Sequence, residues 1–309
     1  YYLYKRLIEV FNNYPEIPYV GYKDENVRTP ITFPAQHQAF QPGMEYEMKP
    51  APIFDNPNYV PSGKLKDKVV IISGEDSGIG RAISLLFAKE GANIVISYLN
   101  EHEDANYTKK LVEGCGRKCV LIPGDLRDEN LSPYIADTAM KCFGKIDILI
   151  NNCGVQFPQN SILDISNKQL RDTFETNIFT FFYLTKAVLP HMQANSSIIN
   201  TTSITAFDGK KNLIDYSATK GAITVFTKSL ALSLADQKIR VNAVAPGPIW
   251  TPLIPSSFNE QEVEIFGTET PLKRAGQPFE LAPAYLYLAS DYSRYVTGQI
   301  IHVNGGTIV

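Results

Sequence analysis

The chain has 309 residues, 44% of them hydrophobic and 20% charged, which is typical of a globular protein with a sizeable buried core. Its formal net charge is −3 and no long basic run occurs, so nothing in the sequence favours binding to nucleic acid. No apolar run approaches the roughly 20 residues of a membrane-spanning helix, so no membrane partner is expected.

The four cysteines are few for this length and lack the doubled C-x-x-C spacing of a zinc site, so no metal is expected. Reduced thiols suit a cytoplasmic protein, and a metal or redox role for Cys115 and Cys119 is the alternative. The opening of the chain also lacks the basic start, apolar centre and small-residue cleavage site of a signal peptide.

Residues 1–63 predict an extended arm. Nine of the 20 prolines fall in this stretch, and no hydrophobic period of 2 or 3.6 lasts long enough to make a regular element. At its start, Leu3, Leu7 and Phe11 share one helical face and predict a short docking helix. Because disordered segments are poor in aromatic residues and this one is rich in them, we expect the arm to lie against the domain or a neighbouring subunit.

Residues 64–309 alternate short β-branched runs with longer amphipathic stretches, the pattern of βαβ units. The predicted strands are residues 68–73, 93–98, 118–123, 147–152, 196–203, 239–246 and 299–304. The predicted helices are residues 78–90, 105–113, 131–143, 167–192, 217–235 and 279–289. The fold class is therefore α/β: one doubly wound parallel sheet of the Rossmann type, preceded by the arm.

The stretch "SGEDSGIGRA", residues 73–82, has the order strand, glycine turn, helix that a dinucleotide fingerprint requires. Gly74 allows a sharp turn, Gly78 lets the backbone approach a pyrophosphate, and Gly80 permits close helix packing. Ser77 and Ile79 belong to the helix start that offers N–H donors. Glu75 and Asp76 do not contradict this prediction, because backbone groups make the cradle; a glycine turn without a ligand is the alternative.

Tyr216 and Lys220 are four residues apart at the start of a predicted helix, so both project from one face. A neighbouring ammonium favours the phenolate, and we expect Lys220 to lower the pKa of Tyr216 below its usual value of about 10. Ser203 ends a strand at the edge where doubly wound folds bind ligands, and it could hydrogen-bond the reacting oxygen. A surface Tyr–Lys pair and a strand-end serine cap are the structural alternatives.

The glycine spacing, "NNCG" at residues 151–154, "YSATK" at residues 216–220 and "PGPIWT" at residues 246–251 together resemble the short-chain dehydrogenase/reductase family. The resemblance extends from Lys64 to the closing "VTGQIIHVNGG". The arm, with "PAQHQAFQPG", further resembles an extended bacterial subgroup described as glucose/ribitol-dehydrogenase-like oxidoreductases. Family members are commonly tetramers, so a homotetramer is expected.

This resemblance implies roles for individual residues. Ser203 would orient the carbonyl, Tyr216 would carry the proton, and Lys220 would bind the nicotinamide ribose. Asn177 matches the fourth catalytic position, which holds a water, and a satisfied core amide is the alternative for it. Further implied cofactor contacts are Asp125 and Leu126 at the adenine, Asn151 and Gly154 on the cofactor side, and Pro246, Gly247, Ile249 and Thr251 at the nicotinamide.

The segment after Thr251, residues 252–271, is expected to form a mobile lid over the substrate. Trp250 either lines the pocket or packs in the core. Cys153 stands where the family usually has Ala, and we expect it to be tolerated packing without a redox role.

The choice of dinucleotide depends on the adenine ribose. Tyr98 occupies the place where an Asp would indicate NAD, and Ser77 the place where Arg or Lys would indicate NADP. Local charge therefore decides, and we expect Glu75, Asp76, Glu101, Glu103 and Asp104 to repel a 2′-phosphate with no cation nearby in sequence. NAD is the predicted cofactor, with NADP as the alternative.

The sequence thus predicts an NAD-dependent oxidoreductase that transfers hydride to or from a small alcohol, aldehyde, ketone or polyol, with Tyr216 as general acid/base. One alternative is an NADP-dependent carbonyl reductase. Another is a dinucleotide-binding sensor or scaffold with weak activity, which need not retain all four catalytic residue types. A third has the arm docking a partner protein.

Overall fold

The computed structural model describes residues 22–23, 28–74 and 76–307 of the chain. The predicted docking helix at the start of the chain and Glu75 lie outside the described residues.

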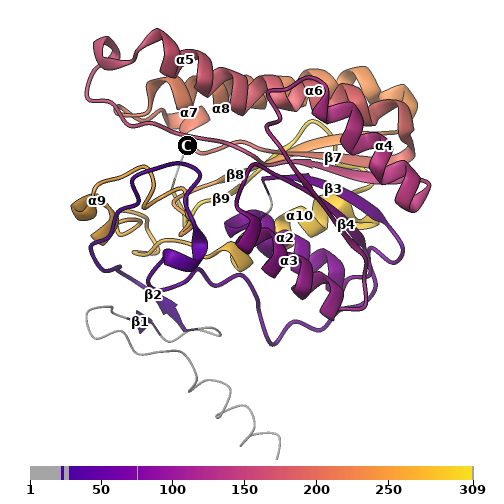
Figure 1. Ribbon diagram of the computed structural model, residues 1–309, viewed down its shortest axis with the longest axis horizontal. Coiled ribbons are helices and arrows are strands. Elements are labelled where there is room, and N and C mark those ends of the chain that lie inside the picture. The colour runs from indigo at the N-terminus through magenta and orange to yellow at the C-terminus, as the bar shows by residue number, and fades with distance from the viewer. Residues whose placement is uncertain (1–21, 24–27, 75, 308–309) are drawn as a thin grey trace, which may run out of the picture.

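At the centre of the fold is a seven-stranded parallel sheet between two layers of helices (Figure 1). Its strand order is β5-β4-β3-β6-β7-β8-β9, which confirms the predicted doubly wound α/β sheet. The strands are β3 (Val69–Ser73), β4 (Asn93–Tyr98), β5 (Cys119–Pro123), β6 (Ile146–Asn151), β7 (Met192–Thr201), β8 (Arg240–Pro246) and β9 (Ile300–Val303).

Two hydrophobic cores lie on opposite faces of the sheet. The first packs α2 (Gly78–Lys89), α3 (His102–Gly114) and α10 (Pro278–Ala289) against the strands. The second packs α4 (Leu131–Phe143), α6 (Thr180–Val188) and α8 (Ile214–Leu234) against the other face. Every residue of β3 is buried, which explains why its sequence is continuously apolar: a strand covered on both faces has no solvent side to alternate with.

The helix predicted over residues 167–192 is divided in the structure. It comprises α5 (Asn167–Phe174), a π-helical turn (Glu175–Phe179), α6 and a short 3₁₀ turn (Leu189–His191) before β7 begins at Met192. These segments follow one another without a break from Asn167 to His191, so the prediction was right in extent and missed only the π-helical and 3₁₀ turns. A π turn keeps helical dihedrals and leaves the apolar pattern of the sequence nearly unchanged.

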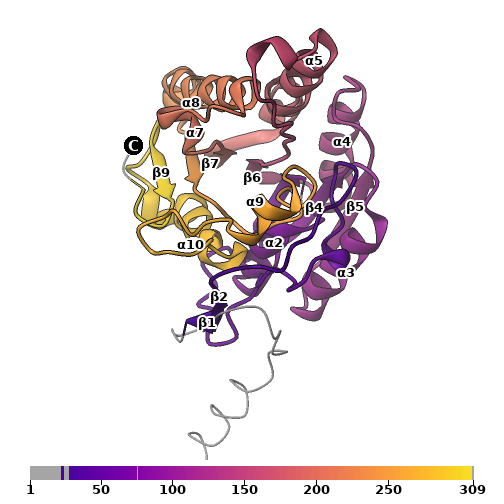
Figure 2. The ribbon, with the colours of Figure 1, turned by 90° about the vertical axis from the view of Figure 1, so that its left-hand side faces the viewer.

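The arm lies against the domain over its described residues. It contributes β2 (Thr29–Pro30), which pairs with β1 (Tyr22–Lys23), and a 3₁₀ turn (Glu45–Glu47). Phe33 stacks on Trp250 with ring centroids 3.7 Å apart, and Trp250 is fully buried, so the indole is core packing and does not line a pocket. Figure 2 shows the indigo arm running beside α9 (Glu260–Glu264), which belongs to the predicted lid.

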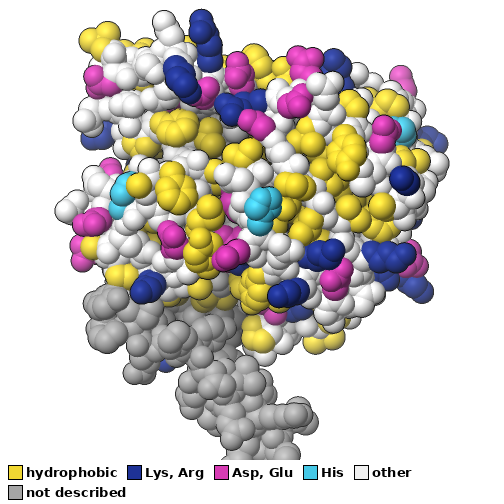
Figure 3. Space-filling view, viewed as in Figure 1, with side chains coloured by type: hydrophobic (Ala, Val, Ile, Leu, Met, Phe, Trp, Pro, Cys, Tyr) yellow, Lys and Arg dark blue, Asp and Glu magenta, His cyan; other side chains and the backbone are white. Residues whose placement is uncertain are grey.

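The surface carries both signs of charge. On the face drawn in Figure 3, basic and acidic side chains are interspersed among hydrophobic ones. Among the described helices, none is long and apolar enough to cross a lipid bilayer. A further short α-helix, α7 (Thr205–Asp208), follows β7 at the carboxyl edge of the sheet.

Candidate active site

A cavity of about 550 Å³ opens at the carboxyl ends of the parallel strands, beside the point where the strand order reverses between β3 and β6. The predicted site residues that line it are Gly74, Asp76, Ser77, Gly78, Ile79, Tyr98, Asp125, Leu126, Gly154, Ser203, Tyr216, Lys220, Pro246, Gly247, Ile249 and Thr251. Three predicted site residues, Gly80, Asn151 and Asn177, do not line it. The cavity therefore brings together the glycine turn, the ends of five strands and the start of α8.

Two glycines of the cradle are required by the backbone. Gly74 and Gly78 have positive φ values of +66° and +53°. A Cβ at Gly74 would lie 2.7 Å from the Cα of Cys153, and one at Gly78 would lie 3.1 Å from the Cβ of Thr251. The turn thus brings the start of α2 to the cavity wall, where backbone N–H groups would meet a dinucleotide pyrophosphate, although the N–H of Gly78 already donates to the carboxylate of Glu45. Gly80 is buried within α2.

At one end of the cavity, here called the catalytic end, Ser203, Tyr216 and Lys220 converge. Ser203 lies two residues beyond β7, and Tyr216 and Lys220 lie in the first turns of α8. The Lys220 ammonium donates a hydrogen bond to the carbonyl oxygen of Thr201 at 3.1 Å. Its nitrogen lies 5.4 Å from the centroid of the Tyr216 ring. The helical spacing therefore places both side chains on one face, as expected.

The expected lowering of the Tyr216 pKa does not occur. Burial raises the pKa of Tyr216 to about 12, and a hydrogen bond with Ser203 offsets only part of this rise. Burial also lowers the pKa of Lys220 to about 8. The expectation was wrong because it considered only the attraction between the two groups, whereas burial disfavours the charged form of each.

Asn177 lies in the π-helical turn and is fully buried. Its amide holds the backbone of Val155 at both polar groups: the Val155 N–H donates to Oδ1 at 2.8 Å and Nδ2 donates to the Val155 carbonyl at 2.9 Å. A Cβ at Gly154 would lie 3.4 Å from Oδ1 of Asn177 and 3.5 Å from Nζ of Lys220. Gly154 therefore lies beside both polar groups, and π turns are frequent at functional sites.

Asn151 and Cys153 have structural surroundings. The Asn151 amide donates to Asn200 at 2.9 Å and Thr185 at 3.2 Å, which ties β6 to β7 and α6 inside the protein. The Cys153 thiol lies 3.5 Å from the Thr180 hydroxyl, and burial raises its pKa, so the thiol stays protonated near neutral pH.

The opposite end of the cavity, here called the acidic end, contains buried carboxyl groups. Asp76 and Glu101 line the cavity and are only 6% and 3% exposed. Burial, with repulsion from Glu101, raises the pKa of Asp76 to about 7. The hydroxyl of Tyr98 lies 3.0 Å from Nδ1 of His102 beside them. A second phosphate near the ribose would therefore meet buried acids.

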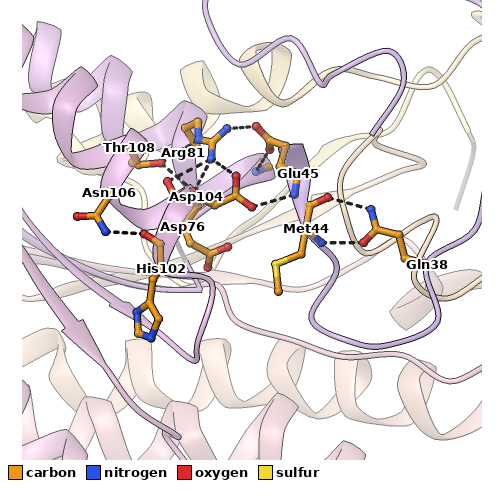
Figure 4. A network of polar contacts seen from close by, with 10 residues as sticks. Gln38, Met44, Glu45, Asp76, Arg81, His102, Asp104, Asn106 and Thr108 are labelled. Carbon is orange, nitrogen blue, oxygen red and sulfur yellow. Dashed lines mark hydrogen bonds and ion pairs between the residues drawn. The ribbon is translucent and has the colours of Figure 1, made fainter. Parts of the chain in front are cut away.

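Sequence reasoning missed Glu45, which reaches this end from the arm (Figure 4). The N–H of Gly78 donates to its carboxylate at 2.6 Å, and the Arg81 guanidinium forms ion pairs with Glu45 and with Asp104, the latter at 3.0 Å. Burial raises the pKa of Glu45 to about 6. The available signal was indirect: Arg81 falls on the buried face of a predicted helix, and a buried cation needs an acidic partner.

The cavity wall also contains a cation. Arg127 lines the cavity and forms an ion pair with Asp125 at 2.6 Å and with Asp172 at 3.5 Å. The Arg127 side chain holds the pKa of Asp125 below its usual range. Arg127 thus adds a cation to the cavity wall that already has two carboxylate partners.

A family model described as "Enoyl-(Acyl carrier protein) reductase" matches residues 74–307. The chain is 63% identical over 278 residues to "Uncharacterized oxidoreductase YhxC" of Bacillus subtilis, an alignment that covers 90% of this chain and 97% of that protein. It is 48% identical to "NADPH-dependent aldehyde reductase 1, chloroplastic" of Arabidopsis thaliana, covering 89% and 98%. It is 47% identical to "Glucose and ribitol dehydrogenase" of Daucus carota, covering 90% and 97%.

Solved structures also resemble this chain. A 3-ketoacyl-(acyl-carrier-protein) reductase from Brucella melitensis complexed with NADH has a TM-score of 0.71 and 30% identity, covering 78% of this chain and 98% of that one. A short chain dehydrogenase from Burkholderia cenocepacia in complex with NADP has a TM-score of 0.74 and 25% identity, covering 79% and 98%. The chain therefore belongs to the short-chain dehydrogenase/reductase family of NAD(P)-dependent oxidoreductases.

Proposed function

We propose that the protein is an NAD(H)-dependent oxidoreductase that interconverts a carbonyl compound and the corresponding alcohol. The observation that carries this proposal is the convergence of Ser203, Tyr216 and Lys220 in the same cavity as the glycine turn of α2. In this proposal the glycine turn of α2 binds the dinucleotide, and Tyr216 in the same cavity is the proton donor. The nicotinamide ring, when bound, supplies or accepts the hydride.

In this proposal the protein moves the proton. Ser203 donates a hydrogen bond that orients the substrate oxygen, and Tyr216 donates its proton to that oxygen as the carbonyl is reduced. Lys220 binds the nicotinamide ribose and connects Tyr216 to solvent through water, while Asn177 holds the cavity-lining Val155. A Tyr216 pKa of about 12 keeps the phenol protonated near neutral pH, which favours the reductive direction there.

The remaining cavity residues would hold the dinucleotide. Gly74, Ser77, Gly78 and Ile79 would surround the pyrophosphate, while Asp125 and Leu126 would contact the adenine. Pro246, Gly247, Ile249 and Thr251 would bound the nicotinamide beside Gly154.

The preference for NAD over NADP rests on the acidic end. Asp76 and Glu101 can accept hydrogen bonds from the ribose hydroxyls, whereas they would repel a 2′-phosphate that carries nearly two negative charges. Two observations favour the alternative, an NADP-dependent reductase: Arg127 lines the cavity, and a relative at 48% identity is named as NADPH-dependent.

We also propose a homotetramer in the cytoplasm. Phe182, Val225 and Leu232 are 46%, 62% and 82% exposed on α6 and α8, and a second copy would cover them. The four thiols are free, which suits a reducing compartment. Light scattering after size-exclusion chromatography should give four times the monomer mass, and a monomer mass would exclude the tetramer.

The proposed activity is tested by mixing the protein with NADH or NADPH and a series of aldehydes, ketones and sugars, and by following oxidation of the reduced nicotinamide. The same substrates in alcohol or polyol form are tested with the oxidised dinucleotides. We expect turnover with at least one substrate class and a higher kcat/KM with NADH than with NADPH. Dinucleotide binding without turnover across all classes would instead favour a sensor or scaffold.

A further inference from the structure

Part of the cavity wall comes from the arm, although the arm precedes the sheet in sequence. Gln41, Pro42 and Gly43 line the same cavity as Tyr216 and Lys220. Of these, Gln41 presents a primary amide that can bond to more than one segment at once.

Gln41 holds the loop that follows β6. Its Nε2 donates to the carbonyl oxygen of Gln156 at 2.6 Å, and its Oε1 accepts from the N–H of Gln156 at 3.3 Å. Both polar backbone groups of Gln156 are therefore satisfied by one side chain. The preceding residue, Val155, is held in the same two-point manner by the Asn177 amide. Two consecutive residues of this cavity-lining loop are thus fixed by two amides, one from the π-helical turn and one from the arm.

Gln41 also reaches the lid, residues 252–271. Its Nε2 donates to the carbonyl oxygen of Ser256 at 3.4 Å, and the hydroxyl of Ser257 donates to Gln156 at 3.4 Å. A single side chain therefore bridges the loop after β6 and the lid. Between them lies the substrate side of the cavity, where Phe157 and Phe258 contribute to the wall.

Neighbouring arm residues keep the arm close to the lid. The N–H of Gln38 donates to the carbonyl oxygen of Pro255 at 2.8 Å, and Nδ1 of His37 lies 2.9 Å from the carbonyl oxygen of Phe258. Gly43 approaches so closely that a Cβ there would lie 2.5 Å from the carbonyl oxygen of Pro252. The lid that the sequence predicts as mobile is therefore braced by the arm over residues 252–258.

We propose that Gln41 is a positioning residue for the substrate, which fixes the loop after β6 and the lid at the separation that the substrate requires. This inference rests on the proposed oxidoreductase function and gives the arm a role within its own active site. The three hydrogen bonds of the Gln41 amide go to Gln156 and Ser256, away from the glycine turn of α2 and Lys220, so its loss should affect the substrate and spare the dinucleotide.

Two substitutions of Gln41 test whether its hydrogen bonds to the loop and the lid position the substrate. In Gln41→Ala all three hydrogen bonds are lost. In Gln41→Glu the side chain keeps its length, but a carboxylate oxygen would face the carbonyl oxygens of Gln156 and Ser256, so this near-isosteric variant should be at least as defective. The matched control is Gln36→Ala, because among the described residues the Gln36 amide bonds to backbone atoms of Pro34 and Lys49, both within the arm.

The kinetic test measures kcat and KM for the carbonyl substrate at saturating NADH, together with the Kd for NADH by fluorescence. We expect Gln41→Ala and Gln41→Glu to lower kcat/KM about tenfold or more, mainly through KM, with the Kd for NADH within about twofold of the parent value. Gln36→Ala should match the parent protein. Parent-like kcat/KM in both Gln41 variants, or an equal loss of NADH binding, would overturn the inference.

Amide hydrogen exchange tests the same inference without turnover, so the positioning role and the proposed activity can fail separately. The full-length Gln41→Ala protein should exchange faster than the parent in the loop around Gln156 and in residues 252–258, while Gln36→Ala should not. Unchanged exchange in both segments would show that Gln41 does not hold them, whatever the enzyme's activity.

Discussion

The two ends of the cavity both contain buried ionisable groups, but the neighbours of these groups differ. At the catalytic end Lys220 is held by the carbonyl oxygen of Thr201, and Tyr216 by Ser203. At the acidic end the Arg81 guanidinium pairs with Glu45 and Asp104, and the Asp76 carboxyl group lies close enough to Glu101 to be repelled by it. Burial favours the neutral forms of Tyr216, Lys220 and Asp76 alike, but the outcome differs. The catalytic end holds a phenol with a raised pKa beside an amine with a lowered one, and the acidic end holds a wall of buried carboxyl groups.

The largest effect is expected at the catalytic end. Tyr216→Phe removes the proton donor and keeps the ring, so kcat should fall by about 10² to 10⁴. The Kd for NADH should stay within about twofold, because the cradle is unchanged. Steady-state kinetics and a binding titration measure the two quantities. Turnover close to that of the parent would exclude Tyr216 as the acid.

The second effect concerns pH. The pKa of Lys220 is lowered to about 8, so this side chain is charged below about pH 8 and neutral above it. If the charged form supplies the proton to Tyr216, kcat for carbonyl reduction should be flat at low pH and fall up to about tenfold per unit above about pH 8. The Kd for NADH over the same range is the control. A rate that stays constant through about pH 10 would contradict this role.

The third effect tests the acidic end. Asp76→Asn removes one buried charge that faces the cavity, and kcat/KM with NADPH should rise about tenfold relative to that with NADH. Glu103→Gln is the matched control, since Glu103 is an exposed acid on α3 and does not line the cavity. Equal responses of the two variants would mean that Asp76 does not govern the choice of dinucleotide.

The smallest effect is on stability. The pKa of Asp76 is raised from 3.8 to about 7, so the stability contributed by its neutral form is fully present below about pH 4 and is lost as the pH rises through about 7. The free energy of unfolding of Asp76→Asn, relative to the parent, should therefore increase by about 1 to 2 kcal/mol between about pH 5 and about pH 8. Urea denaturation of both proteins at the two pH values measures this. A difference that does not change with pH would contradict the raised pKa.

The sequence predicted features that depend on neighbouring residues. The order strand, glycine turn, helix around Gly74 and Gly78 follows from local backbone requirements, and the predicted strands agree with β3 to β9 to within a few residues. The same is true of the shared face of Tyr216 and Lys220, which needs only helical spacing.

Other features depend on contacts between distant segments, which one sequence does not encode in a readable pattern. Glu45 meets Gly78 33 residues further along the chain, and Gln41 meets Gln156 115 residues further along. The Tyr216 pKa was mispredicted for a related reason, because burial depends on the whole fold. The π turn at Asn177 was missed because it adds a residue without interrupting the helical run.

Because Phe33 of the arm stacks on Trp250, the fluorescence of this tryptophan reports whether the arm is docked. Trp250 is the only tryptophan in the chain, it is fully buried, and the arm holds it on two sides through the Phe33 ring and a 2.8 Å hydrogen bond from Nε1 to the carbonyl oxygen of Pro50. Its emission therefore comes from one defined position, next to the first residues of the lid. Any release of the arm would expose the indole to water and shift that emission to longer wavelength, so docking of the arm can be followed in real time without a label.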